Sequence, residues 1–296
     1  MNNLQLCPPD RRPGNVSAGI RINNMKKKYI LTDETIEHLG HTLHRIKAVK
    51  DFATISAGTL GGYVESETNL DHTGAAWVYE NARVSENAKV SGDAKVSGDA
   101  WVSGDAWVYE NAWVYGDAKV SGDAWVSGDA MVSGAAWVSG DAKVSGDAWV
   151  YGAARVSGDA WVSGDAWVYE NAKVSENARV YENARVHGDA WVYGAARVYG
   201  DAWVSGDAKV SGDAWVSENA RVSGDADYTT VHGFGRHFRT TTFFRCNNGV
   251  VRCQCGCFYG SIDEFRAKVR ETHGNSEYAK EYLMIADLME LHFKED

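Results

Sequence analysis

Apolar and polar positions repeat every six residues over the middle half of the chain. Valine occupies every sixth position from Val78 to Val222, in 25 consecutive copies, and alanine recurs with the same spacing from Ala76 to Ala226. A fixed short period is typical of a solenoid, in which one coil cannot bury its apolar side alone and stacking of coils buries it. The pattern therefore predicts an all-β solenoid over residues 75–226.

Each unit reads Ala-Xaa-Val, then Ser or Tyr, then a corner. The alternation predicts a short strand with Ala and Val inward and Xaa toward solvent. The corner is either Gly followed by Asp or Ala, as at Gly92-Asp93, or Glu-Asn, as at Glu80-Asn81. A tight corner needs one residue with positive φ, so we expect Gly to supply it in the first type and Asn in the second. A Gly or Asn in every unit excludes a helix.

The outward positions bear on how many units close one coil. With two units per coil, one column carries a run of tryptophans at Trp101, Trp113, Trp125, Trp137, Trp149 and Trp161, and the other ends in Trp191, Trp203 and Trp215. With three units per coil, like residues do not cluster. This clustering favours two units per coil, a left-handed parallel β-roll of two sheets about 60 Å long, and a triangular coil of three units, about 40 Å long, is the alternative.

The segments flanking the repeat predict two end modules. Residues 1–24 contain all three prolines without apolar periodicity and are expected to be a disordered or extraneous leader. Residues 25–74 predict a small β cap, with strands over 29–32 and 42–46 joined at Gly40. A solenoid end exposes strand edges and apolar core, so a cap is required.

Residues 227–296 predict a small α+β domain. The strands 240–244 and 250–255 flank Asn248-Gly249, a strong hairpin signal. Ser261 and Glu264 form a capping box that opens a helix to about residue 272, and Ser276 opens a second helix to about residue 293. We expect this domain to close the C-terminal end of the solenoid.

The net charge of −10 lies within the repeat. Residues 75–226 hold 22 acidic and 12 basic side chains, with the acids at corners and the bases on the faces. This balance is not typical of nucleic-acid binding. The leader has no apolar signal-peptide region, and no stretch of the chain approaches a membrane span. The sequence therefore predicts a protein of the reducing cytoplasm that does not bind membranes.

Several polar clusters are candidates for metal sites. Cys246, Cys253, Cys255 and Cys257 could hold zinc, but their spacing on a straight strand is too wide, and free thiols are favoured. His38, His41 and His44 are three apart, and the strand interpretation puts them on different faces. Asp93, Asp105, Asp117, Asp129 and Asp141 would stack along one edge and could bind calcium, although Asp is also an ordinary turn residue. No cofactor or metal is predicted.

The cap motif Leu31-Thr32-Asp33-Glu34-Thr35, the segment Gly61-Gly62-Tyr63-Val64-Glu65-Ser66-Glu67 and the repeats resemble phage and prophage left-handed β-roll, or hexapeptide-repeat, proteins. The repeats are also similar to the YdcK-type β-solenoid and, more distantly, to hexapeptide acyltransferases. The resemblance implies the fold and a phage or prophage origin, and no settled activity. Catalysis is not expected, because the repeat has no loop excursion and its single histidine, His187, fills a slot otherwise held by Ser or Tyr.

The outward tryptophans are the candidate interface. A ridge from Trp101 to Trp161 would exceed the scattered apolar residues of a monomer surface, although Trp is also simply a good strand residue. We expect a non-enzymatic scaffold or interaction protein that forms homo-oligomers, with a host protein or a carbohydrate as other partners. An acidic DNA mimic and an acyltransferase are the alternatives.

Overall fold

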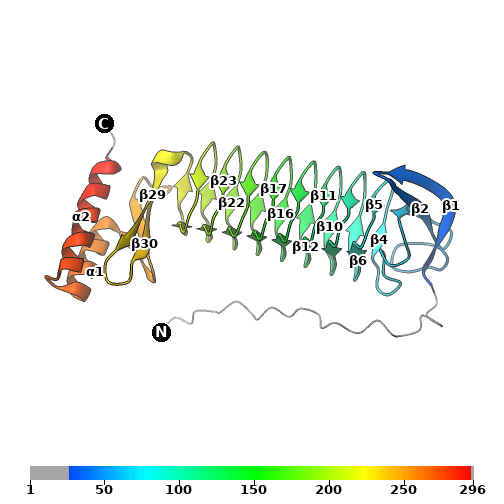
Figure 1. The fold of residues 1–296 in the computed structure, drawn as a ribbon, viewed down its shortest axis with the longest axis horizontal. Coiled ribbons are helices and arrows are strands. Elements are labelled where there is room, and N and C mark those ends of the chain that lie inside the picture. The colour runs from blue at the N-terminus through cyan, green and yellow to red at the C-terminus, as the bar shows by residue number, and fades with distance from the viewer. Residues whose placement is uncertain (1–26, 295–296) are drawn as a thin grey trace.

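The computed structural model describes residues 27–294, so the predicted leader at 1–24 lies outside the described residues. The chain winds into a long parallel solenoid with a β cap at the N-terminal end and a mixed α/β module at the other end (Figure 1). The predicted all-β solenoid with two end modules is therefore confirmed.

The solenoid is triangular, with about nine coils of about 18 residues, so the preference for two units per coil was wrong. Each strand pairs in parallel with the strands three units before and after it, as Trp113 pairs with Lys95 and Met131. The strands form three sheets, here named face I, face II and face III.

Each solenoid strand consists of one outward residue and its valine. Face I contains β5 (Arg83–Val84), β8 (Trp101–Val102), β11 (Lys119–Val120), β14 (Trp137–Val138), β17 (Arg155–Val156), β20 (Lys173–Val174), β23 (Trp191–Val192) and β26 (Lys209–Val210). Face II contains β4 (Trp77–Val78), β7 (Lys95–Val96), β10 (Trp113–Val114), β13 (Met131–Val132), β16 (Trp149–Val150), β19 (Trp167–Val168), β22 (Arg185–Val186), β25 (Trp203–Val204) and β28 (Arg221–Val222). Face III contains β6 (Lys89–Val90), β9 (Trp107–Val108), β12 (Trp125–Val126), β15 (Lys143–Val144), β18 (Trp161–Val162), β21 (Arg179–Val180), β24 (Arg197–Val198) and β27 (Trp215–Val216).

The interior of the triangle is filled by the repeated Ala and Val side chains. From Ala76 to Val222 these residues are at most 1% exposed. Small side chains suit this interior because the three sheets approach one another closely, and the backbone of each coil bonds to the next, as in the bond from Trp113 N to Ala130 O of 2.9 Å. The inward assignment of Ala and Val is confirmed from Ala76 to Val222, and the outward residues are outward except Trp77, which is fully buried, whereas Ala226 is exposed in the turn after the last coil.

The corners differ from the expectation at the Glu-Asn units. The positive φ belongs to the Glu, for example 53° at Glu80 and 60° at Glu110, and not to the Asn. Glu occupies the slot that Gly holds in the other units, and its carboxylate reaches one coil onward. Glu110 Oε2 accepts a hydrogen bond from the Gly128 N–H at 2.6 Å, and Glu80, Glu170, Glu176 and Glu182 repeat the contact. This bond offsets the strain that a left-handed residue with a Cβ carries.

The N-terminal cap continues face I. The predicted hairpin is confirmed as β1 (Tyr29–His38) and β2 (His41–Ala48), which pair antiparallel. β3 (Leu60–Val64) then pairs antiparallel with β2 and parallel with β5, so it acts as the first solenoid strand. Gly61 is required there, because a Cβ would lie 2.6 Å from Ile46 and from the Val78 carbonyl oxygen.

The C-terminal module closes the last coil. It contains a short 3-10 turn (Asp225–Asp227), β29 (Tyr228–Phe234), β30 (Arg239–Arg245), β31 (Val251–Cys255), β32 (Phe258–Ser261), α1 (Ile262–His273) and α2 (Glu277–His292). The predicted hairpin and both helices are confirmed, and β29 and β32 were not predicted. Phe244 packs into the solenoid core, whereas its neighbour Phe243 faces the helices. One strand therefore separates two cores.

Candidate interaction surface

The outward side chains of adjacent coils form cation–π ladders. Lys89 Nζ lies 4.8 Å from the ring centre of Trp107, and Lys143 Nζ lies 5.3 Å from that of Trp125. The Arg185 guanidinium lies between two rings, Trp167 at 4.9 Å and Trp203 at 5.0 Å. Each exposed contact of this kind contributes about 0.5–1 kcal/mol. The tryptophans therefore serve first to stabilise the coil stack.

The number of residues per coil is indicated by the alternation of tryptophan with Lys or Arg at the outward positions, and not by clustering of like residues. At a spacing of 18 residues a tryptophan usually has a Lys or Arg as a neighbour, which places opposite partners in contact. The blocks of like residues seen at a spacing of 12 correspond to no contact in the structure. The 18-residue period is present in the sequence as an alternation of tryptophan with Lys or Arg.

Face II contains one cation-free run. Four consecutive outward residues there, Trp113, Met131, Trp149 and Trp167, lie on paired strands. Trp113 is 39% exposed and Trp149 is 37% exposed. The rings of Trp149 and Trp167 stack with centres 5.3 Å apart at 8°. This run is the longest apolar stretch among the outward positions of the three faces, and we name it the face II strip.

A column of aromatic rings runs beside the strip at the following corner. Tyr151 stacks on Tyr169 at 5.0 Å, and Tyr169 stacks on His187 at 4.7 Å. Burial raises the pKa of Tyr151 and of Tyr169, so both hydroxyl groups are uncharged at neutral pH. The rings of Tyr151 and Tyr169 widen the strip without adding charge.

The nine predicted interface tryptophans do not lie together. Face I carries Trp101, Trp137 and Trp191; face II carries Trp113, Trp149 and Trp203; face III carries Trp125, Trp161 and Trp215. The expected ridge from Trp101 to Trp161 therefore does not exist, because it depended on two units per coil. Met131, Tyr151 and Trp167 belong to the surface and were missed; a search at a spacing of 18 residues would have found them.

The four cysteines do not share one site. Cys246 lies in the solenoid core, and Cys253 lies in the core under the helices. Cys255 is half-buried and Cys257 is exposed, and all four are free thiols. Within residues 27–294, no group of three or more His, Cys, Asp or Glu side chains is arranged to hold a metal ion. The arrangement of four thiolates around one zinc ion is not found there.

The edge of stacked aspartates, considered as a candidate calcium site, is also divided. With 18 residues per coil, Asp93 and Asp129 share a corner column with Asn111 between them, and Asp105, Asp117 and Asp141 lie in other columns. Asn111 Nδ2 donates to Asp129 Oδ1 at 3.0 Å. The expectation that the five aspartates stack in a single ladder was therefore wrong. Like the tryptophan ridge, it depended on two units per coil.

The histidines have separate partners. The His38 ring meets the edge of Trp101 at 4.8 Å, His41 Nδ1 lies 3.0 Å from Glu65 Oε1, and His44 Nδ1 lies 3.1 Å from the Thr32 carbonyl oxygen. The hydrogen bond to Glu65 raises the pKa of His41. These contacts fix the cap hairpin on the first coils.

His187 stands in the aromatic column. Its ring is stacked on Tyr169, and Nδ1 lies 3.7 Å from Glu170 Oε2. The corner bearing it has the same six-residue length as its neighbours, so no loop leaves the winding there. His187 therefore contributes a ring to the surface.

In the part of the chain that the structure describes, no helix has the length and apolar character needed to cross a membrane.

Comparison with known families supports the fold. Residues 124–140, 154–170 and 178–194 match the YdcK β-solenoid repeat model. All three segments lie within the triangular coils. A comparison with curated proteins found no significant match. The repeat is thus similar to the YdcK-type β-solenoid, and this similarity concerns the fold.

Proposed function

We propose that this protein is a non-enzymatic, rigid β-solenoid scaffold that associates with a second copy of itself through face II. The observation that carries the proposal is the face II strip, Trp113 to Trp167, together with the charges on either side of it. Lys95 precedes the strip and Arg185 follows it on the same face. The strip therefore has a cation one strand beyond each end.

Face II is complementary to itself in an antiparallel arrangement. Both copies have the same strand spacing of about 4.8 Å, so rows of side chains on two facing copies can interdigitate over the whole length. A two-fold axis at Trp149 opposes positions equally distant from it. The facing pairs are then Met131 with Trp167, Trp113 with Arg185, and Lys95 with Trp203.

This arrangement places no like charges opposite each other and adds four cation–π contacts, each of roughly 0.5–2 kcal/mol. The facing surface is narrow and about 30 Å long. The area that it buries is therefore smaller than the roughly 800 Å² per partner of a standard interface. We therefore expect a dimer that dissociates on dilution.

Face I lacks this complementarity about an axis near its centre. With the axis at Trp137, Lys119 of one copy opposes Arg155 of the other, and with the axis between Trp137 and Arg155, Lys119 opposes Lys173. Trp137 is 43% exposed, close to the value for Trp149. Trp137 is therefore a matched control for Trp149.

The test is sedimentation velocity over a concentration series. Trp149→Ser should shift the monomer–dimer transition to at least tenfold higher concentration, because stacking and apolar burial at the axis are lost, whereas Trp137→Ser should leave it unchanged. Circular dichroism checks that both variants fold. A wild-type protein that stays monomeric at all concentrations, or equal effects of the two variants, contradicts the proposal.

Face III provides a further comparison. An axis between Lys143 and Trp161 would also oppose tryptophans to cations, although Trp161 is less exposed than Trp149 and lies beside Lys143 and Arg179. Loss of the dimer in Trp161→Ser but not in Trp149→Ser would move the interface to face III and would contradict the assignment to face II.

The corner acids support a scaffold over a DNA mimic. One carboxylate oxygen of Glu110, Glu170 and Glu182 accepts a hydrogen bond from a backbone N–H of the next coil. Such carboxylates are less available to imitate a row of phosphates. A phage or prophage origin stays a prediction.

A further inference from the structure

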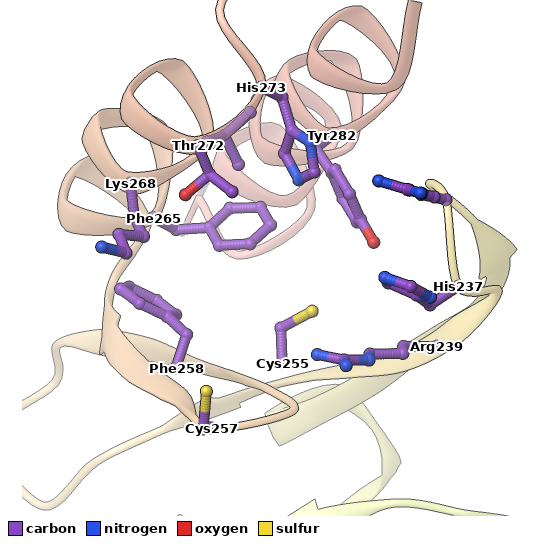
Figure 2. Close-up of a pocket in the computed structure, with 12 residues that line it drawn as sticks. His237, Arg239, Cys255, Cys257, Phe258, Phe265, Lys268, Thr272, His273 and Tyr282 are labelled. Atoms are coloured by element: carbon purple, nitrogen blue, oxygen red, sulfur yellow. The ribbon is translucent and has the colours of Figure 1, made fainter.

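The C-terminal module contains a hollow that the solenoid does not share. Figure 2 shows side chains from the β29–β30 turn, the β31–β32 turn and both helices converging on one space. Its volume is about 230 Å³. An apolar cavity of roughly 150 Å³ is enough to hold benzene, so this hollow has room for one six-membered ring with a substituent.

The rim of the hollow is basic. Arg236 comes from the β29–β30 turn, Arg239 is the first residue of β30, and Lys268 comes from α1. The described residues that line the hollow include no Asp or Glu. Lys268 has an ion pair with Glu271 at 2.9 Å, while Arg236 and Arg239 have no carboxylate partner among residues 27–294.

Other arginines of the module are neutralised. Arg266 contacts three carboxylates, those of Asp263, Asp287 and Glu290. Arg252 lies 3.8 Å from Glu264. Arg252 and Arg266 therefore have carboxylate partners, whereas among the described residues Arg236 and Arg239 at the hollow do not, although the chain as a whole carries a net charge of −10.

The position of Arg239 is set by its contact with a glycine. A Cβ at Gly256 would lie 2.5 Å from Arg239 Nη1, so the guanidinium rests directly on the Gly256 backbone. Gly256 has φ of 60° in the turn between β31 and β32. The Arg239 side chain extends from β30 toward Cys255, as Figure 2 shows.

The floor of the hollow is aromatic. Phe258 and Phe265 have ring centres 5.6 Å apart, and Phe265 meets Tyr282 edge-on at 5.8 Å. The Tyr282 hydroxyl donates to the Phe234 carbonyl oxygen at 3.3 Å, which fixes that wall. An apolar floor under unpaired cations suits a ligand with a flat apolar body and a negative group.

We propose that this hollow binds a small aromatic anion, one ring bearing a carboxylate or a phosphate. The ring lies over Phe258 and Phe265, and Arg236 and Arg239 bind the anionic group. The site is independent of face II, since it lies beyond the last solenoid strand, β28. Its presence would give the scaffold a ligand-dependent end module.

The experiment is titration calorimetry of the full chain with phenyl phosphate, benzoate, benzyl alcohol and inorganic phosphate. Phenyl phosphate or benzoate should bind with a single saturable site, and the neutral ring and the bare anion should each bind at least tenfold more weakly. A preference between phenyl phosphate and benzoate identifies the anionic group.

Variants locate the binding. Arg239→Gln should weaken the aromatic anion about tenfold or more, because it removes a hydrogen bond to a charged group worth roughly 1.5–3 kcal/mol. Arg270→Gln is the matched control, since Arg270 is exposed on α1 and does not line the hollow. Arg236→Gln provides a second test if Arg239→Gln fails to fold.

Alkylation of Cys257, which is exposed at the hollow, gives a readout besides affinity. Phenyl phosphate should slow the alkylation in the wild type and not in Arg239→Gln. Absence of saturable binding by both aromatic anions, equal weakening in Arg239→Gln and Arg270→Gln, or unprotected Cys257 would each overturn the proposal.

Discussion

The corner position held by Gly in most units and by Glu in others leads to an unusual prediction about substitutions at Gly140. Gly140 has φ of 69°, and a Cβ there would lie 2.9 Å from the Gly158 N of the next coil. Ordinary reasoning about volume would rank Gly140→Ala as milder than Gly140→Glu. The structure predicts the reverse order.

The magnitudes follow from two contributions. A residue with a Cβ in the left-handed region costs roughly 1–2 kcal/mol, and both variants carry this cost together with the close approach to Gly158. The Glu variant alone can place a carboxylate oxygen on the Gly158 N–H, as Glu110 does on Gly128 at 2.6 Å. An exposed hydrogen bond of this kind contributes about 1 kcal/mol. Gly140→Ala should therefore lower the free energy of unfolding by about 1 kcal/mol more than Gly140→Glu.

The assay is urea denaturation followed by tryptophan fluorescence. Glu170→Ala provides the converse, because it keeps the strain and loses the bond from the Gly188 N–H, and it should cost about 1 kcal/mol. Glu170→Gly should be nearly neutral, since relief of strain offsets the lost bond. If Gly140→Glu proves as destabilising as Gly140→Ala, or more so, the account of the corners is wrong.

Three further predictions concern the ends of the solenoid. Phe244→Ala should lower the free energy of unfolding by about 3–5 kcal/mol and speed hydrogen exchange in the last coil, because Phe244 is fully buried there. Phe238→Ala, at an exposed position, is the control. Equal losses in the two variants would contradict the packing of Phe244 into the solenoid core. Gly61→Ala should cost about 1–3 kcal/mol in urea denaturation through contact with Ile46, unlike Gly224→Ala, which meets no close neighbour; an unaffected Gly61→Ala would contradict the steric account. Burial lowers the pKa of Lys28 from 10.5 to about 8, so the unfolded chain binds this proton more tightly and the free energy of unfolding should rise between pH 8 and 10.5. Lys28→Met should abolish this rise. A variant with the same dependence of stability on pH as the wild type would contradict the assignment to Lys28.

Local features of the sequence predicted most elements correctly. The hairpin around Gly40 became β1 and β2, and the capping box of Ser261 and Glu264 opens α1, with the Ser261 side chain accepting from the Glu264 N–H. These elements depend on contacts a few residues apart, so their signals are visible in short windows. β29 and β32 were missed because each is defined by its neighbouring strands and has no turn signal as strong as Asn248-Gly249.

The candidate surface was predicted less well. The tryptophans were recognised as outward, and they are, apart from Trp77, which lies under the cap against Phe52. Their grouping was wrong because it depends on which coils are neighbours. The hollow around Arg239 was not foreseen, since its lining comes from several strands, turns and helices between Arg236 and Tyr282 that only the folded module brings together.

The sequence by itself determined that this chain is a solenoid, which side chains fill it and where its corners fall, because each of these properties is repeated within one unit of six residues. Only the tertiary structure decided that three units close a coil, and thereby which tryptophan meets which cation. The physical reason is that the coil closes through packing between sheets, and the energy of a cation beside a ring appears only when residues 18 apart are brought into contact.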